Sequence, residues 1–480
     1  MANRNPSRRR SPFTIGRRTL LGGGAALLAT QTLARGRTAP GKGPNFLFIM
    51  ADDLGYADLS CYGRRDFDTP HIDRLARSGL RYLDGYANSP VCSATRIGLI
   101  TGRYQYRFPA GLEEPIAFRN VGLNGNEVTL PGELRSVGYS TALIGKWHIG
   151  ALPQYSPLKS GYQDFWGVRG GGVDYFTHKV GDQHDLWDGD VPSHETGYLT
   201  DLIGNHAIDA LVRLGRSNAP FLLSVHFTAP HWPWEGPGDE AVARELDGDK
   251  GFGRIQHYDG GTMKTYAEMV QRLDLQVGRL LDALDRLGLE ENTVVVFTSD
   301  NGGERFSDVW PFTGRKTELL EGGIRVPTIV RWPGRTRAGS TSTEAIMSMD
   351  WMPTFLAAAG VQLDSRVSLD GWDIGATLSG GTLSERSLFW RYKYRGQEAA
   401  RIGNWKYLKI GDNSFLFDIA RDPMERANLK ARRPEIFDEL KSAFDRWNAS
   451  MLPYEDENYS HGFQPSQMAD HFAAEETGSR

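Results

Sequence analysis

The stretch "TVVVFTSDNGG", residues 293–303, decides the fold class of this chain. Its first half is a run of β-branched and aromatic residues without a polar face, which is typical of a strand buried on both sides. Its second half changes to Asp300-Asn301 and two glycines, so the strand runs directly into a polar turn. Strands of this kind occur in parallel sheets whose two faces are covered by helices.

Three further apolar runs have the same character and alternate with helical segments. They are "NFLFIM" (45–50), "STALIGKW" (140–147) and "PFLLSVHF" (220–227). Residues 70–80 and 264–287 instead repeat their apolar positions at helical spacing. This alternation predicts an α/β fold with a large, mostly parallel sheet sandwiched between helices.

The pattern changes after about residue 375. Strands with charged positions and turn residues between them follow one another in "RSLFWRYKY", "AARIGNWKYLKI" and "NSFLFDIARD". One amphipathic helix comes next, with five residues on its apolar face: Ile436, Phe437, Leu440, Phe444 and Trp447. We therefore predict a catalytic domain over residues 41–375 and a small C-terminal α+β domain with an antiparallel sheet over residues 376–480. The polar tail from Glu455 carries no structural prediction.

The first 34 residues differ in kind from the rest. A basic region ends in Arg17-Arg18, and a short, glycine-rich apolar stretch runs from Thr19 to Ala34. This arrangement resembles a twin-arginine export signal with cleavage after Ala34, and it is too short for a membrane span. The prediction is an exported protein, periplasmic or extracellular, with the twin-arginine export machinery as a partner. The alternative is a basic arm on a cytoplasmic protein.

Composition narrows the classes of function. The chain has 480 residues and a net charge of −4, and no basic stripe follows residue 37, which argues against nucleic acid as a partner. Cys61 and Cys92 are the only cysteines, so a disulfide framework is excluded. No stretch after the N-terminal segment is apolar enough to form a stable membrane span.

Polar clusters follow the predicted strands, at the ends where open α/β sheets bind their ligands. Asp52-Asp53 follows the strand at 45–50, and Asp300-Asn301 follows the strand at 293–299. Lys146-Trp147-His148 and His231 follow two further strands. Three carboxylates and an amide oxygen in one place would need a cation, and Ca²⁺ prefers such oxygen ligands. Turn and helix-capping chemistry is the alternative for each acidic pair taken alone.

Six motifs occur together in one order between residues 51 and 327. They are "ADDLGYADLSCYG", "SPVCSATRIGLITGR", "GKWHIG", "APHWPW", "SDNGG" and "GRKTELLEGGIRVP". In this order and context they resemble the type I, formylglycine-dependent sulfatases of the alkaline-phosphatase-like superfamily. "GNWKYLKI" and "LFDIARDPMERANL" near the C-terminus are similar to sulfatase endings as well, so the resemblance covers most of the chain from about residue 44.

The resemblance implies that a formylglycine-generating maturase oxidises Cys92 to Cα-formylglycine. The hydrated aldehyde has two hydroxyls: one attacks sulfur and expels the alcohol, and the other loses its proton so that sulfate leaves. One position departs from the family's Cys-X-Pro-X-Arg core, because Ala94 replaces the proline. Alanine variants occur particularly among sulfatases matured by radical-type enzymes, so the motif does not decide which maturase acts.

The resemblance also assigns roles to single residues. Four would hold Ca²⁺: Asp52, Asp53, Asp300 and Asn301. Arg96 and Lys146 would neutralise charge around the formylglycine. His148 would hydrogen-bond its spare hydroxyl and assist sulfate elimination. His231 and Lys316 would contact the oxygens of the sulfate ester, with His231 protonating the leaving alcohol.

We predict a sulfated carbohydrate, with Trp232, Asp174 and His178 as candidate contacts. The first alternative is a phosphonate monoester or phosphodiester hydrolase with the same fold and nucleophile. The second is a protein that binds glycans without catalysis: if Cys92 stayed a thiol, the pocket would still hold Ca²⁺ and an anionic sugar.

Overall fold

A ten-stranded sheet forms the centre of the molecule. The computed structural model of the chain describes residues 43–117, 120–151, 153–247, 255–364, 366–464 and 467. The strands lie in the spatial order β13 (Ser340–Ser342), β2 (Leu80–Tyr82), β12 (Thr328–Arg331), β11 (Thr293–Ser299), β1 (Asn45–Ala51), β10 (Phe221–His226), β4 (Ser140–Gly145), β5 (Asp164–Gly167), β8 (Trp187–Asp188) and β9 (Val191–Pro192). The five central strands, β11 to β5 in that order, pair in parallel. Antiparallel pairs with β12 and β8 continue the sheet on the two sides, and β13 pairs in parallel with β2 at one edge. The predicted mostly parallel sheet is confirmed.

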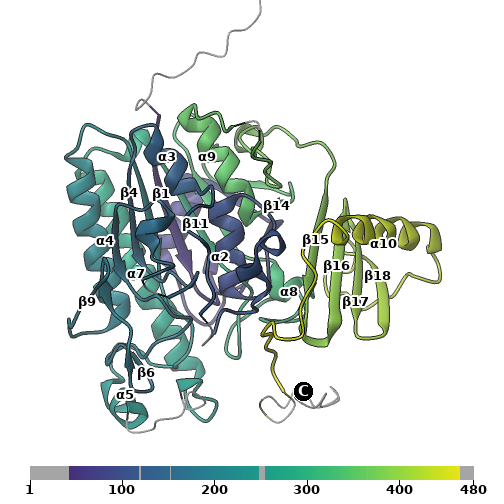
Figure 1. Cartoon of the computed structure of the whole chain (residues 1–480), viewed down its shortest axis with the longest axis horizontal. Coiled ribbons are helices and arrows are strands. Elements are labelled where there is room, and N and C mark those ends of the chain that lie inside the picture. Colours follow the sequence, from purple (N-terminus) through teal and green to yellow (C-terminus); the bar gives the residue numbers. More distant parts are fainter. Residues whose placement is uncertain are drawn as a thin grey trace, which may run out of the picture. The chain divides into compact units, whose positions relative to one another are not determined.

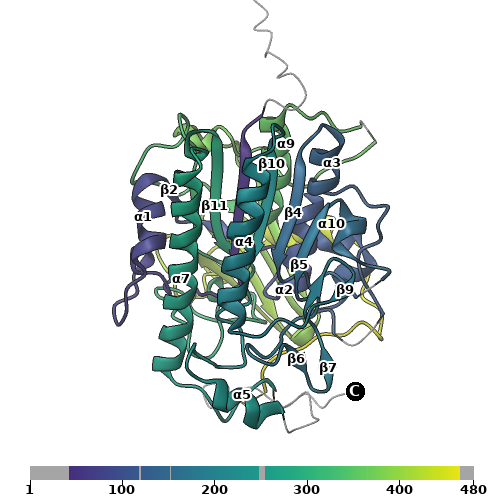
Figure 2. The same cartoon turned by 90° about the vertical axis from the view of Figure 1, so that its left-hand side faces the viewer.

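Helices cover both faces of this sheet (Figures 1 and 2). One face is covered by α1 (Pro70–Ser78), α4 (Leu199–Gly215) and α7 (Met263–Arg286). The other face is covered by α2 (Cys92–Thr101), α3 (Leu130–Ser136) and α9 (Trp351–Ala359). Two further short helices are α5 (Glu240–Asp247) and α8 (Glu321–Ile324). The helices predicted over residues 70–80 and 264–287 correspond to α1 and α7.

The sequences of the central strands are continuous apolar runs because each strand contributes side chains to two separate hydrophobic cores. In β1, Leu47 and Ile49 pack on the side of α4 and α7, whereas Phe46 and Phe48 pack on the side of α9. Successive side chains of a strand point to opposite faces, so a sheet with helices on both sides has no solvent-facing positions at its centre. A polar residue in β1 would therefore be buried on either face.

The register of the central strands places their carboxyl ends at one edge. Met50 of β1 lies between His226 of β10 and Thr298 of β11, and Gly145 of β4 pairs with His226. The residues that follow β1, β11, β4 and β10 consequently emerge side by side. This alignment explains why four sequence clusters separated by up to about 250 residues meet in space.

The C-terminal part forms the predicted antiparallel sheet with one helix (Figure 1). Its strands are β15 (Ser387–Tyr392), β16 (Gln397–Ile402), β17 (Trp405–Ile410) and β18 (Asn413–Asp418), and α10 (Pro434–Asn448) packs against them through Phe437, Leu440 and Phe444. Two small two-stranded sheets pair β3 (Gly85–Tyr86) with β14 (Ile346–Met347) and β6 (Lys179–Val180) with β7 (Gln183–His184).

The proposed export segment, residues 1–34, lies outside the described residues, and the boundaries at 41, 375 and 376 stay predictions. Within the described part of the chain, no helix combines the length and the hydropathy that a membrane crossing requires.

A buried ion-pair network connects the C-terminal sheet to the loop that leads from the main sheet. Lys406 of β17 lies 2.9 Å from the Glu321 carboxylate of α8 and 2.8 Å from the Glu425 carboxylate, and all three side chains are fully buried. Glu321 has a second partner in Arg325, at 3.0 Å. Removing Lys406 would leave Glu425 without an ion-pair partner in a site that water does not reach.

We expect Lys406→Met to lower the free energy of unfolding by about 3 kcal/mol, because breaking a buried pair leaves an uncompensated charge. Chemical denaturation followed by circular dichroism measures this loss. Lys409→Met on the same strand is the matched control, since the Lys409–Glu398 pair is partly exposed and its loss should cost less than about 1 kcal/mol. Equal stability of the two variants would contradict the assignment.

Candidate active site

The predicted polar clusters meet at the carboxyl edge of the central strands. Asp52 directly follows β1, Asp300 follows β11 and Lys146 follows β4, while His231 lies in the loop after β10. Cys92 reaches the same place from the first position of α2. The structure thus brings together all ten residues predicted to bind metal or to act in catalysis: Asp52, Asp53, Cys92, Arg96, Lys146, His148, His231, Asp300, Asn301 and Lys316.

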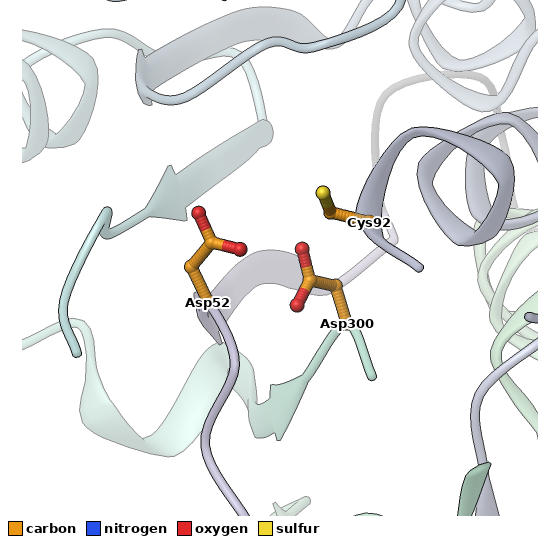
Figure 3. A group of neighbouring side chains, drawn as sticks. All are labelled: Asp52, Cys92 and Asp300. Atoms are coloured by element: carbon orange, nitrogen blue, oxygen red, sulfur yellow. The ribbon is translucent and has the colours of Figure 1, made fainter. Parts of the chain in front are cut away.

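Three carboxylates and the thiol of Cys92 converge at the base of the site. Asp52, Cys92 and Asp300 each offer one ligand atom, and these atoms lie within 4.8 Å of one another (Figure 3). Asp53 joins Asp52 and His231 in a second group of the same size. The Asn301 amide donates to the Asp53 carboxylate over 2.7 Å, which directs its own carbonyl oxygen elsewhere.

The donor set fits a hard divalent cation. Asp52 Oδ1 and Asn301 Oδ1 are both buried and accept no hydrogen bond within the described part of the chain. Burial and the neighbouring Asp300 raise the pKa of the Asp52 carboxyl well above its usual range. Buried oxygens without donors are costly, and a calcium ion would satisfy them with the oxygen ligands that it prefers.

Three side-chain cations balance the three carboxylates. Lys146 donates to Asp52, and Lys316 donates to Asp53 over 2.5 Å. Arg96 holds Asp300 with two hydrogen bonds of 3.0 and 2.8 Å. These six charges sum to zero, so the protein alone supplies no excess of positive charge for an anionic substrate. A divalent cation would supply it.

Cys92 is a buried and protonated thiol. Its side chain is 1% exposed, and burial raises the pKa of the thiol to about 11 although Lys146 opposes the shift. A thiolate, not a thiol, is the nucleophilic form of cysteine. The unmodified side chain is therefore a poor nucleophile at neutral pH.

Both histidines have one nitrogen fixed by a backbone carbonyl. His148 Nε2 lies 2.8 Å from the Ile116 carbonyl, which assigns the proton to Nε2 and leaves the buried Nδ1 as a bare acceptor. His231 Nδ1 lies 2.7 Å from the Trp232 carbonyl, and its Nε2 faces Asp53 at 3.6 Å. Burial and the nearby lysines lower the pKa of both imidazoles, so both rings are neutral in the resting site.

A cavity of about 570 Å³ opens above these groups, within the usual size of ligand pockets. Cys92, His148, His231, Trp232 and Lys316 line it. The predicted contact through Trp232 is therefore compatible with the geometry, and the role itself stays a prediction.

Asp174 and His178 do not line this cavity. The Asp174 carboxylate accepts the backbone N–H groups of Phe176 and Thr177, and the His178 ring is buried against the Gly197 carbonyl. These hydrogen bonds stabilise the local turn, and contact of either residue with the substrate stays a prediction. The two glycines of this stretch lie directly against catalytic candidates. A Cβ on Gly171 would lie 2.6 Å from the His148 ring, and one on Gly172 would lie 2.8 Å from the His231 ring.

Sequence reasoning missed two parts of the cavity wall. Arg169 comes from the loop after β5 and Trp187 from β8, whereas the polar tail contributes Tyr459, His461 and Phe463. Glu114 holds this tail in place through backbone hydrogen bonds with Tyr459 and His461, of 2.9 and 3.0 Å. Such pairing across more than 340 residues has no local sequence signal.

Comparisons with known proteins agree with this geometry. The sulfatase family model matches residues 44–361, and the model for the C-terminal region of N-sulphoglucosamine sulphohydrolase matches residues 314–449. Arylsulfatase J of Mus musculus is 29% identical over 87% of this chain and 77% of its own length. N-acetylgalactosamine-6-sulfatase of Homo sapiens is 31% identical over 76% of this chain and 71% of its own length.

Among solved structures, Ps i-CgsB in complex with k-i-k-neocarrahexaose is similar with a TM-score of 0.78 and 29% identity, covering 88% of this chain and 95% of that one. The sulfatase match spans well over half of the chain and includes the elements that carry Asp52, Cys92 and Asp300. The chain belongs to the sulfatase family, and its activity is the hydrolysis of sulfate esters.

Proposed function

We propose that this sulfatase removes sulfate from a sulfated carbohydrate, using formylglycine made from Cys92 together with one Ca²⁺ ion. The observation that carries the proposal is the position of Cys92. Its side chain points at the Asp52 and Asp300 carboxylates (Figure 3) and lines the same cavity as His231 and Lys316.

The protonated thiol of Cys92 supports the need for modification, because the unmodified side chain is neither ionised nor able to present two hydroxyls to the site. When present, the hydrated aldehyde supplies a hydroxyl nucleophile and a second hydroxyl for sulfate release, and Ca²⁺ polarises a sulfate oxygen. Asp52, Asp53, Asp300 and Asn301 are the residues that would hold the ion.

The remaining side chains handle charge and protons. Arg96, Lys146 and Lys316 place fixed positive charge around the reacting group, where it favours an anionic transition state. His148 Nδ1 is a buried acceptor with a neutral ring, so it can take a proton from a hydroxyl at Cys92. His231 Nε2 lies near Asp53, and in the protonated form of the ring it can give its proton to the departing alcohol.

A carbohydrate substrate is supported by the relatives and by the cavity. One relative is named for a sulfated amino sugar, and one similar structure holds an oligosaccharide. Trp232 presents an aromatic ring beside His231, with the ring centroids 4.1 Å apart, and such rings pack against sugar faces.

Two measurements test the proposal. The first is mass spectrometry of the tryptic peptide spanning residues 82–96 from protein made in its native host, where formylglycine appears as the loss of H₂S and the gain of one oxygen. The second compares kcat/KM for para-nitrophenyl sulfate and para-nitrophenyl phosphate. An unmodified Cys92 overturns the mechanism, and faster hydrolysis of the phosphate favours the phosphoester alternative.

A variant of His231 separates acid catalysis from binding. We expect His231→Gln to lower kcat/KM for phenyl sulfate by about 10²-fold, since general acid catalysis contributes at least this much when the leaving group is basic. For para-nitrophenyl sulfate, whose leaving phenolate is less basic, the loss should be under about tenfold. Because burial and lysines lower the pKa of His231, its protonated fraction grows as pH falls, so wild-type kcat/KM for phenyl sulfate should rise toward acid pH. Equal losses on both esters would contradict a role as acid.

We further propose that residues 1–34 direct export through the twin-arginine machinery and that a formylglycine-generating maturase acts on Cys92 beforehand. The arginine pair Arg17-Arg18 and the Cys92 motif support these two partners. A periplasmic or extracellular location follows from the same proposal.

A further inference from the structure

Arg169 is a buried cation that forms no ion pair with any of the residues the structure describes. Its side chain lies in the loop after β5, is 6% exposed and lines the cavity. Within the described part of the chain, its guanidinium donates no hydrogen bond and forms no salt bridge, and its buried Nε has no partner. Burial lowers the pKa of Arg169 only to about 10, so the group stays charged at neutral pH. An unpaired buried charge is costly unless a ligand pairs with it.

Asp185 and Asp190 are close enough to raise the pKa of Arg169, but both carboxylates accept hydrogen bonds from other groups, Asp190 from the Ser156 hydroxyl at 2.7 Å. Asp185 accepts the backbone N–H groups of Arg169 and Gly170, at 3.1 and 2.7 Å, and the indole N–H of Trp187 at 2.8 Å. With its carboxylate used in this way, Asp185 fixes the loop and the indole but leaves the guanidinium unpaired. The guanidinium instead lies over the face of Trp187, with its central carbon 3.2 Å from the ring centroid. Stacking on an aromatic ring orients the planar group and keeps its N–H donors available at the edge.

The loop that carries Arg169 also touches the catalytic groups. The Arg169 carbonyl accepts the backbone N–H of His148 at 3.2 Å, and the Gly171 carbonyl accepts a hydrogen bond from Lys146. Gly172 lies against the His231 ring. Since a chain spans at most about 3.6 Å per residue, the Arg169 backbone is within about 7 Å of the glycine that contacts Lys146. A substrate with its ester at Cys92 would extend along this wall.

We propose that Arg169, oriented by Trp187 and Asp185, forms a second anion-binding subsite that takes an oxyanion of the substrate other than the ester being hydrolysed. This inference rests on the proposed function, because it assumes a sugar in the cavity. A sulfate and a carboxylate share the oxygen geometry that a guanidinium edge binds with two hydrogen bonds. The substrate class is therefore a sugar carrying at least two anionic groups.

The test measures binding in the absence of turnover. The full-length Cys92→Ala protein and the Cys92→Ala/Arg169→Met protein are titrated calorimetrically in calcium-containing buffer. The three probes are a monosulfated N-acetylgalactosamine, a disulfated N-acetylgalactosamine, and a disaccharide of glucuronate and monosulfated N-acetylgalactosamine. We expect at least one of the two dianionic probes to bind about tenfold or more tightly than the monoanion, and Arg169→Met to remove this preference. The sulfate and carboxylate arms identify which oxyanion the subsite takes.

Lys179→Met controls for the loss of a positive charge nearby. Lys179 lies in β6, pairs with Asp247 at the surface and does not line the cavity, so its replacement should keep the preference for dianions. Melting temperatures exclude misfolding, and Arg169→Met should remain folded because it removes an unpaired buried charge.

The inference is overturned if the dianions bind no more tightly than the monoanion, or if the preference survives Arg169→Met. Neither result depends on hydrolysis. Failure of the proposed function is seen separately, as a lack of sulfate release by the Cys92 protein or an unmodified Cys92 peptide.

Discussion

Cys92→Ala abolishes sulfate release, lowering kcat for para-nitrophenyl sulfate by at least about 10⁴-fold, as expected when the group that forms the covalent bond is removed. Alanine keeps the small side chain at the start of α2, which is buried along its whole length, so the fold and the metal site should persist. The loss would therefore be in kcat, with bound calcium and melting temperature close to those of the wild type.

Cys61→Ala is the matched control for this variant. Cys61 is the second free cysteine, and it packs against the core near α1, away from the cavity lining. Its replacement should leave kcat unchanged within about twofold, since it makes no contact with the reacting groups. Residual activity of Cys92→Ala near the wild-type level would mean that another group is the nucleophile.

We expect Asp300→Asn to remove the proposed calcium ion and to lower kcat/KM for para-nitrophenyl sulfate by about 10³-fold, because a bound cation stabilises transition-state charge by several kcal/mol. The variant loses one of three carboxylates in the site and leaves Arg96 without its closest anionic partner. Atomic emission should find about one calcium per wild-type chain and a large reduction in the variant. Exhaustive chelation of the wild-type protein should reproduce the loss, and added Ca²⁺ should reverse it.

Asp350→Asn distinguishes loss of metal from loss of a buried ion pair. Asp350 is fully buried and pairs with Arg386 at 2.7 Å, as Asp300 pairs with Arg96 at 2.8 Å, but it lies outside the cavity. Both variants should melt at lower temperature. Only Asp300→Asn should lose calcium, and a calcium content unaffected by Asp300→Asn would contradict the assigned ligands.

Much of the fold was predictable because its strongest sequence signals are local. β1 and β11 are apolar at every position since each packs on two cores, and the acidic pairs stand at the points where these strands end. The rule that ligands bind at the carboxyl ends of parallel strands then places Asp52 and Asp300 together without further information.

The walls of the cavity were less predictable because they depend on distant pairing. Arg169 becomes a candidate binding residue only in the structure, where its buried Nε has no hydrogen-bond partner among the described residues and its guanidinium stacks on Trp187. In "GGVDYFTH" we predicted substrate contacts for the polar Asp174 and His178. The backbone of Gly171 and Gly172, however, is the part that lies against the rings of His148 and His231. A polar side chain is an obvious candidate for function in a sequence. Close approach of the backbone to a functional group is indicated only by a glycine.

The burial of Cys92 limits when this residue could be modified during biosynthesis. Cys92 is 1% exposed at the start of α2, in a cavity that Tyr459 and His461 also line, so the folded protein leaves a large oxidising enzyme little access to its β-carbon. If Cys92 is oxidised as proposed, the oxidation would therefore belong to the interval after residue 92 is synthesised and before α2 packs. Each chain has one such interval, and a chain that folds first would be a stable product without a nucleophile.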